Sequence, residues 1–311
     1  MDRLDVGILK ILLLNNGVPP GVPVLRKSFR SIARDLGVDQ GTVRSRMRRF
    51  QASGILRGWF LGVSPGLTGH DLYSAWLGTE GPVDRSAAID ALLSDPNIER
   101  VCNYLGPQFS LILFAEKGAD LGPAVRRLTS RAGFGVRLLR ERLVRVPLRR
   151  LKPTDSSIIA CLQTDPWKPY SIVADEVGVS AKTVARRVAA MSEEGLIYLL
   201  PSIDLRALTG MIPVELVVQY RHAESKARVN ELLVPRLREG LVFSDTSGSQ
   251  GYFALFVSNI AQMVQLAEWV SRQEGVLKVH TDVLQDVLLN RNHYESQRFL
   301  LQQPPPGFEK S

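Results

Sequence analysis

Residues 27–56 read KSFRSIARDLGVDQGTVRSRMRRFQASGIL, and residues 168–197 read KPYSIVADEVGVSAKTVARRVAAMSEEGLI. The two stretches align without a gap at a constant separation of 141 positions. Each has an apolar helical pattern, a Gly-Val turn and a second helical pattern that ends at a glycine, which is typical of a helix-turn-helix. The identities are Lys27/Lys168, Ala33/Ala174, Gly37/Gly178, Val38/Val179, Thr42/Thr183, Val43/Val184, Arg46/Arg187 and Gly54/Gly195. We therefore predict a chain that contains two copies of one unit.

The N-terminal region predicts three helices of one compact module. An apolar run over residues 4–13 forms the first helix, and Ser28 is suited to cap a second helix of about eight residues. Gly37 supplies the left-handed conformation that ends this second helix. A third helix is expected over residues 40–52, and residues 55–63 are expected to form a two-stranded wing. The apolar positions of the third helix, expected to face the other two, are Val43, Met47 and Phe50.

After each helix-turn-helix the chain repeats one order of elements, strand-helix-strand-strand-helix-strand. This is the order of the ferredoxin-like plait, an antiparallel sheet with two helices on one face, so we predict the α+β fold class. In the first half the expected ranges are 72–77, 85–94, 98–104, 109–115, 121–132 and 136–147. In the second half they are 214–220, 226–238, 241–246, 252–257, 260–273 and 276–289.

These elements predict four domains and a tail. Residues 1–63 are expected to form the first winged helix-turn-helix, and residues 64–150 the first plait. Residues 151–203 repeat the winged helix-turn-helix, and residues 204–297 repeat the plait. Residues 298–311, with their run of prolines, are expected to form a disordered tail.

The charge of the 311-residue chain is unevenly distributed. Residues 1–150 carry 23 Lys and Arg against 13 Asp and Glu, a net charge of +10. Residues 151–311 carry 16 against 18, a net charge of −2. Within residues 24–57 the balance is nine against two. A basic segment in an otherwise near-neutral chain indicates one surface that binds a polyanion.

The third predicted helix places polar and basic side chains opposite its apolar face. When the N-terminus of such a helix enters a major groove, these residues contact base edges, arginine with guanine and glutamine with adenine. Flanking cations then contact phosphates. The residues predicted to contact bases, or bases and phosphates, are Gln40, Thr42, Arg44, Ser45 and Arg48. The residues predicted to contact phosphates are Arg26, Lys27, Arg30, Arg49 and Arg57.

The second helix-turn-helix is much less basic. Residues 165–198 hold four Lys and Arg against five Asp and Glu, and alanines replace Arg44, Arg48 and Arg49. Two interpretations stay open: this module chiefly packs, dimerises or contacts a partner, or it also touches DNA. Its candidate DNA-contacting residues are Lys182, Thr183, Arg186 and Arg187.

Nearly the whole chain, twice over, resembles the leucine-responsive/AsnC family of prokaryotic transcription regulators. The resemblance rests on Ile32-Ala33, Leu36-Gly37-Val38, Thr42-Val43, Arg46 and Gly54-Ile55, on their counterparts Val173-Ala174, Val177-Gly178-Val179, Thr183-Val184, Arg187 and Gly195-Leu196-Ile197, and on Leu67-Thr-Gly69 and Leu208-Thr-Gly210. It implies a sequence-specific regulator that binds double-stranded DNA. It also implies pairing through the plaits, either as a homodimer or as an intramolecular pseudo-dimer.

Members of that family often bind amino acids at interfaces between plaits. The loop before the third plait strand then commonly reads Gly-Asp/Glu-Tyr-Asp. Here the loops read Gly106-Pro-Gln-Phe109 and Gly248-Ser-Gln-Gly-Tyr252, without either acid. The usual contacts to an amino-acid effector are therefore missing, and a small-molecule effector stays open.

Two other function classes remain as alternatives. The tandem architecture also resembles the siroheme decarboxylases, with Lys168-Pro-Tyr170 as a faint counterpart of an Arg-Pro-Phe-like step. Such catalysis calls for histidines around a tetrapyrrole, and the plait segments hold His222 and His280, with His70 just before the first. We find no nucleophile-base set and expect no enzyme. A non-DNA-binding adaptor is the other alternative.

The remaining chemistry-bearing residues predict no further site. The four histidines show no metal-ligand spacing, so we expect no metal and no cofactor. Cys102 and Cys161 lie among apolar residues and are expected to be small buried thiols in a cytoplasmic protein. No apolar run approaches the roughly 20 residues that a membrane helix needs, so we expect no membrane partner.

Overall fold

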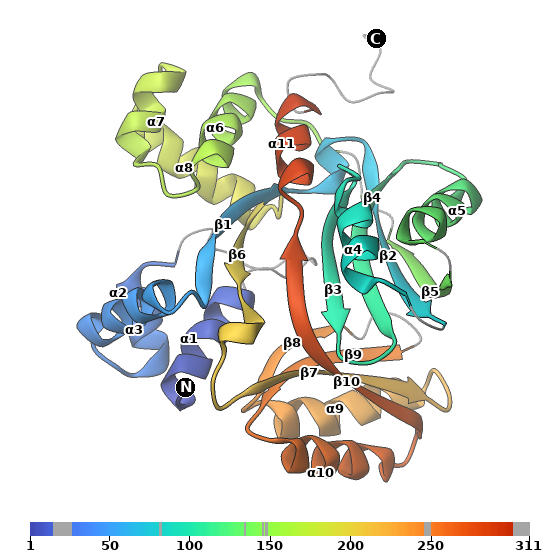
Figure 1. The fold of residues 1–311 in the computed structure, drawn as a ribbon. Helices are drawn as coiled ribbons and strands as arrows, with labels where there is room; N and C mark the ends of the chain where they lie inside the picture. Colours follow the sequence, from blue (N-terminus) through green and yellow to red (C-terminus); the bar gives the residue numbers. More distant parts are fainter. Residues whose placement is uncertain are drawn as a thin grey trace.

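The computed structural model describes residues 1–14, 27–80, 83–133, 135–144, 146, 149–245 and 250–300. Within these ranges each half of the chain gives three helices, a strand, a short 3-10 turn and a plait, in the predicted order (Figure 1). The predicted α+β class is confirmed. The loop at residues 15–26, with Arg26, and residues 301–311 of the expected tail lie outside the described residues. Residues 298–300, also predicted as tail, instead form the end of the helix α11 (Arg291–Leu300).

The two helix-turn-helix modules have matching helices. Ser28 accepts a hydrogen bond from the Ser31 amide at the start of α2, and the second helix of each module ends at a left-handed glycine, Gly37 with φ +67° and Gly178 with φ +74°. The first module contains α1 (Arg3–Leu14), α2 (Phe29–Leu36) and α3 (Gln40–Ala52). The second contains α6 (Pro153–Thr164), α7 (Tyr170–Val177) and α8 (Ala181–Glu193).

Each plait has its strands and helices in the predicted order. The first contains β2 (His70–Thr79), α4 (Arg85–Leu93), β3 (Ile98–Tyr104), β4 (Gln108–Glu116), α5 (Leu121–Ala132) and β5 (Val136–Val144). The second contains β7 (Ile212–Tyr220), α9 (Ser225–Leu237), β8 (Leu241–Asp245), β9 (Gln250–Val257), α10 (Ile260–Ser271) and β10 (Val276–Leu289). The short turns that precede them are η1 (Pro65–Leu67) and η2 (Leu205–Ala207).

The long strand β10 joins the two plaits into one sheet. Its first part, residues 276–283, pairs with β7, and its second part, residues 284–289, pairs with β3. The eight strands therefore lie in the order β5-β2-β4-β3-β10-β7-β9-β8, all in antiparallel pairs. The basic strand β5 lies at one edge of this sheet.

The segment after the first helix-turn-helix is not the predicted two-stranded wing. It is one strand, β1 (Leu56–Val63), which pairs antiparallel with its counterpart in the other half, β6 (Ile197–Ile203). The prediction was wrong because eight continuous strand residues leave no room for a hairpin turn. The second strand of the pair comes from a segment about 140 positions away.

The register of this pair relates the two modules by a local two-fold axis. Trp59 lies opposite Pro201, and Phe60 lies opposite Leu200. At the repeat separation of 141 positions, Trp59 corresponds to Leu200 and Phe60 corresponds to Pro201. Trp59 therefore pairs with the residue that corresponds to Phe60, and Phe60 pairs with the residue that corresponds to Trp59. This reciprocal pairing is the signature of an isologous interface. The chain forms with itself the kind of contact that a symmetric dimer forms between subunits.

The hydrophobic cores of the two modules are exchanged across this axis. Leu61 and Val63 of β1 are buried in the core of the second module. Ile203 and Leu205, from the second half, are buried in the core of the first. Burying such a side chain stabilises a fold by roughly 1.5–3 kcal/mol, so neither module has a complete core without residues of the other half.

Each module also contacts the rest of the chain. Val242 and Phe256 of the second plait belong to the core of the first module. At the same junction the Lys10 ammonium donates to the Arg238 carbonyl at 2.6 Å. The second module contacts α11 (Arg291–Leu300), a helix that the sequence pattern did not predict. None of the helices in the described ranges is long and apolar enough to span a bilayer.

Candidate nucleic-acid interface

The helix α3 separates its apolar and polar faces as predicted. Val43 and Phe50 are fully buried, and Met47 is 7% exposed. The N-cap Asp39 accepts a hydrogen bond from the Thr42 amide at 2.8 Å and fixes the start of the helix. The polar residues of the opposite face, all exposed, are Gln40, Arg44, Ser45 and Arg48.

The exposed arginines of α3 are available to a ligand. Within the described part of the chain, Arg44 and Arg48 form no ion pair and no hydrogen bond through their side chains. Arg30, at the start of α2, is exposed in the same way. A guanidinium in this state keeps all five donors for a base edge or a phosphate.

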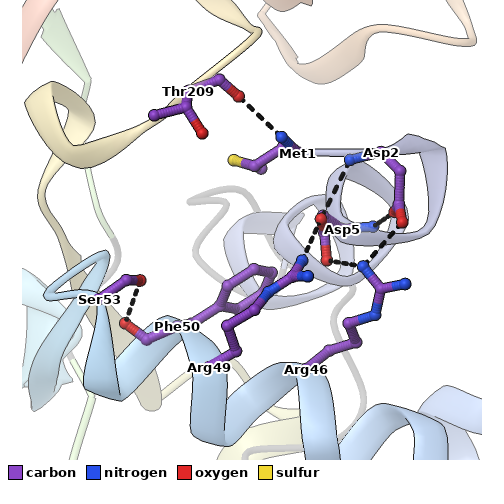
Figure 2. Close-up of polar contacts among 8 residues, drawn as sticks. All are labelled: Met1, Asp2, Asp5, Arg46, Arg49, Phe50, Ser53 and Thr209. Carbon is purple, nitrogen blue, oxygen red and sulfur yellow. Dashed lines mark hydrogen bonds and ion pairs between the residues drawn. The ribbon is translucent and has the colours of Figure 1, made fainter.

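Two other arginines of α3 face α1 instead (Figure 2). The Arg46 Nη1 atom lies 2.9 Å from Asp5 and 2.7 Å from Asp2, and Arg49 pairs with Asp5 as well. The Asp5 side chain is 1% exposed, so these are partly buried ion pairs. Arg49 was predicted to contact phosphate, but its side chain is oriented toward Asp5 and holds α3 against α1.

The two aspartates also order the N-terminus of α1. The Asp2 amide donates to the Asp5 carboxylate at 3.0 Å, and the Asp5 amide donates to Asp2 at 2.9 Å. The hydrogen bond from the Asp5 amide, followed by Arg46, lowers the pKa of Asp2. The ion pair with Asp2 in turn raises the pKa of Arg46. The shared identity Arg46/Arg187 therefore has a structural explanation.

Three more predicted contact residues have partners inside the protein. The Thr42 hydroxyl donates to Asp39, and this bond is the first cause of a lowered Asp39 pKa. Lys27 pairs with Asp35 at 3.1 Å. Arg57 pairs with Asp204 of the second half. Of the predicted set, the structure leaves the exposed face of α3 and Arg30 unengaged among the described residues.

The second module has the same frame but a different surface. Arg187 pairs with Asp155, whose side chain is 4% exposed, so this predicted DNA-contacting residue repeats the role of Arg46 instead. The Thr183 hydroxyl bonds with Ser180 at 3.0 Å. Lys182 and Arg186 are exposed. Ala185 and Ala189 are exposed at the positions of Arg44 and Arg48.

The sequence held one signal for these structural ion pairs that the prediction missed. Asp5 and Asp155 both lie in the first turn of the first helix of their module. Arg46 and Arg187 occupy equivalent positions in a basic and a near-neutral module, so their presence does not depend on the charge of the module surface. It coincides with an aspartate in the first helix of each module.

Polar side chains also connect the two plaits. The Tyr104 hydroxyl donates to Glu215 at 2.9 Å, and burial raises the Tyr104 pKa well above its usual value. Trp76 stacks on Tyr252 with ring centroids 5.0 Å apart. Gln108, from the loop expected to hold an effector in the family, donates to Asp282. Of the corresponding second loop, Gly248 and Ser249 lie outside the described residues.

The rings of His70 and His293 both contact Phe114, with ring centroids 6.3 Å and 4.6 Å from it. Both cysteines are free, and both are partly buried, not fully buried as predicted. Burial still raises the pKa of Cys102 to about 11. The His280 ring lies 2.8 Å from Asp282 on the exposed side of β10, and His293 is buried on α11. Across the described ranges no group of three or more His, Cys, Asp and Glu residues is arranged to hold a metal ion.

Comparison with known proteins finds likeness over parts of the chain. The AsnC-type helix-turn-helix domain matches residues 153–192. The HTH-type transcriptional regulator Ptr1 of Methanocaldococcus jannaschii is 42% identical over 65 residues, which are 21% of this chain and 38% of Ptr1. An uncharacterized HTH-type transcriptional regulator of Pyrococcus horikoshii is 27% identical over 117 residues, 37% of this chain and 72% of that protein. The chain thus spans well under half the length of Ptr1.

The fold has a counterpart over almost the whole chain. The siroheme decarboxylase NirDL matches 97% of this chain and 99% of its own, with a TM-score of 0.54 and 14% identity. A second structure of NirDL, in complex with an iron-uroporphyrin III analogue, matches with a TM-score of 0.52. Identity this low shows the shared fold alone. The chain therefore contains, at residues 153–192, a helix-turn-helix of the AsnC type, and it is similar over part of its length to two archaeal HTH-type transcriptional regulators.

Proposed function

We propose that the protein is a transcription regulator that binds double-stranded DNA sequence-specifically, with α3 in the major groove. The observation that carries the proposal is the exposed face of α3. Gln40, Arg44, Ser45 and Arg48 stand there opposite a buried apolar face. Both archaeal relatives are HTH-type transcriptional regulators, which supports the same function.

The contacts follow from the chemistry of these side chains. Arg44 and Arg48 can each bind the O6 and N7 atoms of guanine with two parallel hydrogen bonds, and Gln40 can bind adenine in the same way. Arg30 is placed to neutralise a phosphate at the edge of the groove. The ion pairs of Arg46 and Arg49 with Asp5 fix the angle of α3 before binding, so little ordering is needed on the DNA.

Charge reversal on α3 tests this function. Gel shifts of the whole chain on random duplex, across salt concentrations, should show binding that weakens steeply as salt rises. The variant Arg44→Glu/Arg48→Glu should lose this binding, by at least a hundredfold at about 100 mM salt. The matched control Arg126→Glu/Lys278→Glu changes the net charge equally at exposed plait residues and should bind as the wild type does. Unchanged binding by the α3 variant would remove α3 from the interface.

A siroheme-decarboxylase-like enzyme is the second candidate, because the NirDL fold matches nearly the whole chain. The histidines give it less support. Both ring nitrogens of His293 are hydrogen bonded within the protein, to the Pro96 carbonyl and to Gln297. His70 is bonded to the Thr68 hydroxyl. An absorption spectrum after incubation with siroheme tests for the enzyme. A bound-tetrapyrrole band together with decarboxylated product would show that the protein is a decarboxylase and not a regulator.

A non-DNA-binding adaptor is the remaining candidate. The near-neutral surface of the second module is its main support. The salt-dependent gel shift separates it from the regulator, because an adaptor has no affinity for random duplex at any salt concentration. A regulator of this kind would act in the cytoplasm.

A further inference from the structure

We propose that one chain occupies two adjacent half-sites of a single DNA duplex and reads bases in one of them only. The proposal rests on the proposed DNA-binding function and adds the stoichiometry and the class of target. The target is an asymmetric duplex, with one specified half-site beside one that is held through its phosphates alone.

The first step is that the pairing surface lies inside the chain. β1 pairs with β6 over most of its length, and the two module cores exchange residues across that pair. The plaits are joined by the β10–β3 pairing and by the Tyr104–Glu215 hydrogen bond. Two modules related by a two-fold axis are therefore present in one chain, which is what helix-turn-helix proteins usually obtain by dimerising.

The exposed faces of α3 and α8 point in the same direction along the local two-fold axis. A two-fold rotation keeps the component of any vector along its axis. Whichever way the exposed face of α3 points along the local axis between β1 and β6, the equivalent face of α8 points the same way. We infer that one duplex lying across that side meets both helices, in the way that the two recognition helices of a two-fold dimer enter successive major grooves of one duplex.

The third step is the difference between the two helix surfaces. Where α3 offers Arg44 and Arg48, α8 offers the methyl groups of Ala185 and Ala189, which carry no hydrogen-bond donor to a guanine edge. Arg187, the one arginine of α8 that corresponds to an arginine of α3, is paired with Asp155. Lys182 and Arg186 remain exposed, and each can neutralise a phosphate.

The combination predicts unequal half-sites. The α3 half-site carries the sequence information, because base contacts specify while phosphate contacts position. The α8 half-site adds affinity for any sequence of the right length. A palindrome, the target of two equal readers, should bind no better than a duplex with one intact half-site.

Selection of bound duplexes from a random library, with the full chain, tests this directly. One specified half-site should emerge, hydroxyl-radical footprinting should protect the backbone beyond it on one side, and native mass spectrometry should give one chain per duplex. A palindromic consensus, protection of the specified half-site alone, or two chains per duplex would overturn the inference. Failure of the wild type to bind any duplex would instead overturn the proposed function.

Two variants of α8 separate phosphate contact from packing. Lys182→Ala/Arg186→Ala should make the salt dependence shallower by about 2 in log Kd against log salt, without changing the selected sequence. An unchanged slope would show that α8 does not touch DNA. Ala185→Arg/Ala189→Arg should bind a palindrome of the specified half-site at least tenfold better than the original duplex. No such preference would show that α8 does not enter the groove, and thermal melting should confirm that both variants are folded.

Discussion

At the scale of single residues, the arginines of α3 divide into two groups with different tasks. Arg44 and Arg48 are exposed and without ion-pair partners in the described part of the chain. Arg46 and Arg49 pair with the buried Asp5. Sequence alone lists four arginines on one basic helix, and burial of the partner carboxylate decides which of them are free to bind DNA.

Asp5 should therefore matter for the stability of the first module. Asp5→Asn keeps the size of the side chain but removes the charge that Arg46 and Arg49 need. Since both arginines are partly exposed, we expect a loss of about 1–3 kcal/mol in the free energy of unfolding. Asp35→Asn is the control, because its pair with Lys27 is more exposed and should contribute less than about 1 kcal/mol. Urea unfolding measures both, and equal effects would contradict the assigned role of Asp5.

The buried histidines should make the protein less stable in mild acid. Burial lowers the pKa of His293 and of His70, against the opposing influence of Glu99 and Glu116 respectively. From about one pH unit above 6.5 both are mostly neutral in the folded and the unfolded chain, and nearly the full stability is present. As the pH falls through about 6.5, the unfolded chain takes up protons before the folded chain does. The free energy of unfolding should then fall, by at most about 1.4 kcal/mol per pH unit for each histidine.

The variant His293→Gln checks this cause. It removes one titrating ring while keeping a side chain that can bond to the Pro96 carbonyl. Its unfolding free energy, followed by urea titration from pH 7.5 to 5.5, should decline less steeply than that of the wild type. His222→Gln, at an exposed residue, should leave the decline as it is. The same slope in His293→Gln and wild type would assign the pH dependence to other groups.

At the scale of elements, the β1–β6 pair makes each module depend on the other half of the chain. Leu61 lies on β1, in the first half, yet it is 1% exposed within the core of the second module. The contribution of β1 residues to the core of the second module explains why residues 56–63 form a single strand. Its apolar residues find partners in α6 and β6, not in a local hairpin.

Truncation of Leu61 should therefore loosen the opposite module. Leu61→Ala leaves a cavity that costs about 2–5 kcal/mol. Hydrogen exchange should become faster in α6 and α8, although the substitution is about 100 positions away in sequence. Leu232→Ala, on the exposed face of α9, should leave exchange unchanged. Faster exchange confined to α1–α3 would contradict the exchanged core.

At the scale of the whole molecule, the sequence predicted the helices and strands that each half repeats. It did not predict the contacts that join the two halves. Periodicity and turn glycines predicted α3 at residues 40–52 and β10 at residues 276–289 with their observed bounds. They also predicted the exposed face of α3, since one helix fixes both of its faces. The β1–β6 pair, the packing of α11 and the Arg187–Asp155 pair depend on contacts between distant segments, which no local pattern encodes.

The two helix-turn-helix modules share their internal ion pairs but differ in their exposed residues. The frame of each module is repeated, down to the arginine that pairs with an aspartate of the first helix. The exposed residues of α3 and α8 differ: Arg44 and Arg48 of α3 correspond to Ala185 and Ala189 of α8. The two side chains of α3 that are exposed and placed to read DNA are therefore Arg44 and Arg48.

The most direct test replaces both with lysine, which keeps the charge but loses the two-pronged hydrogen bonding of arginine. Fluorescence anisotropy should compare Arg44→Lys/Arg48→Lys with the wild type on a selected duplex and on a scrambled duplex of equal length. We expect the variant to bind the scrambled duplex within about threefold of the wild type, because phosphate attraction is retained. Its preference for the selected duplex should fall at least tenfold. A variant that keeps the full preference would contradict base reading by α3.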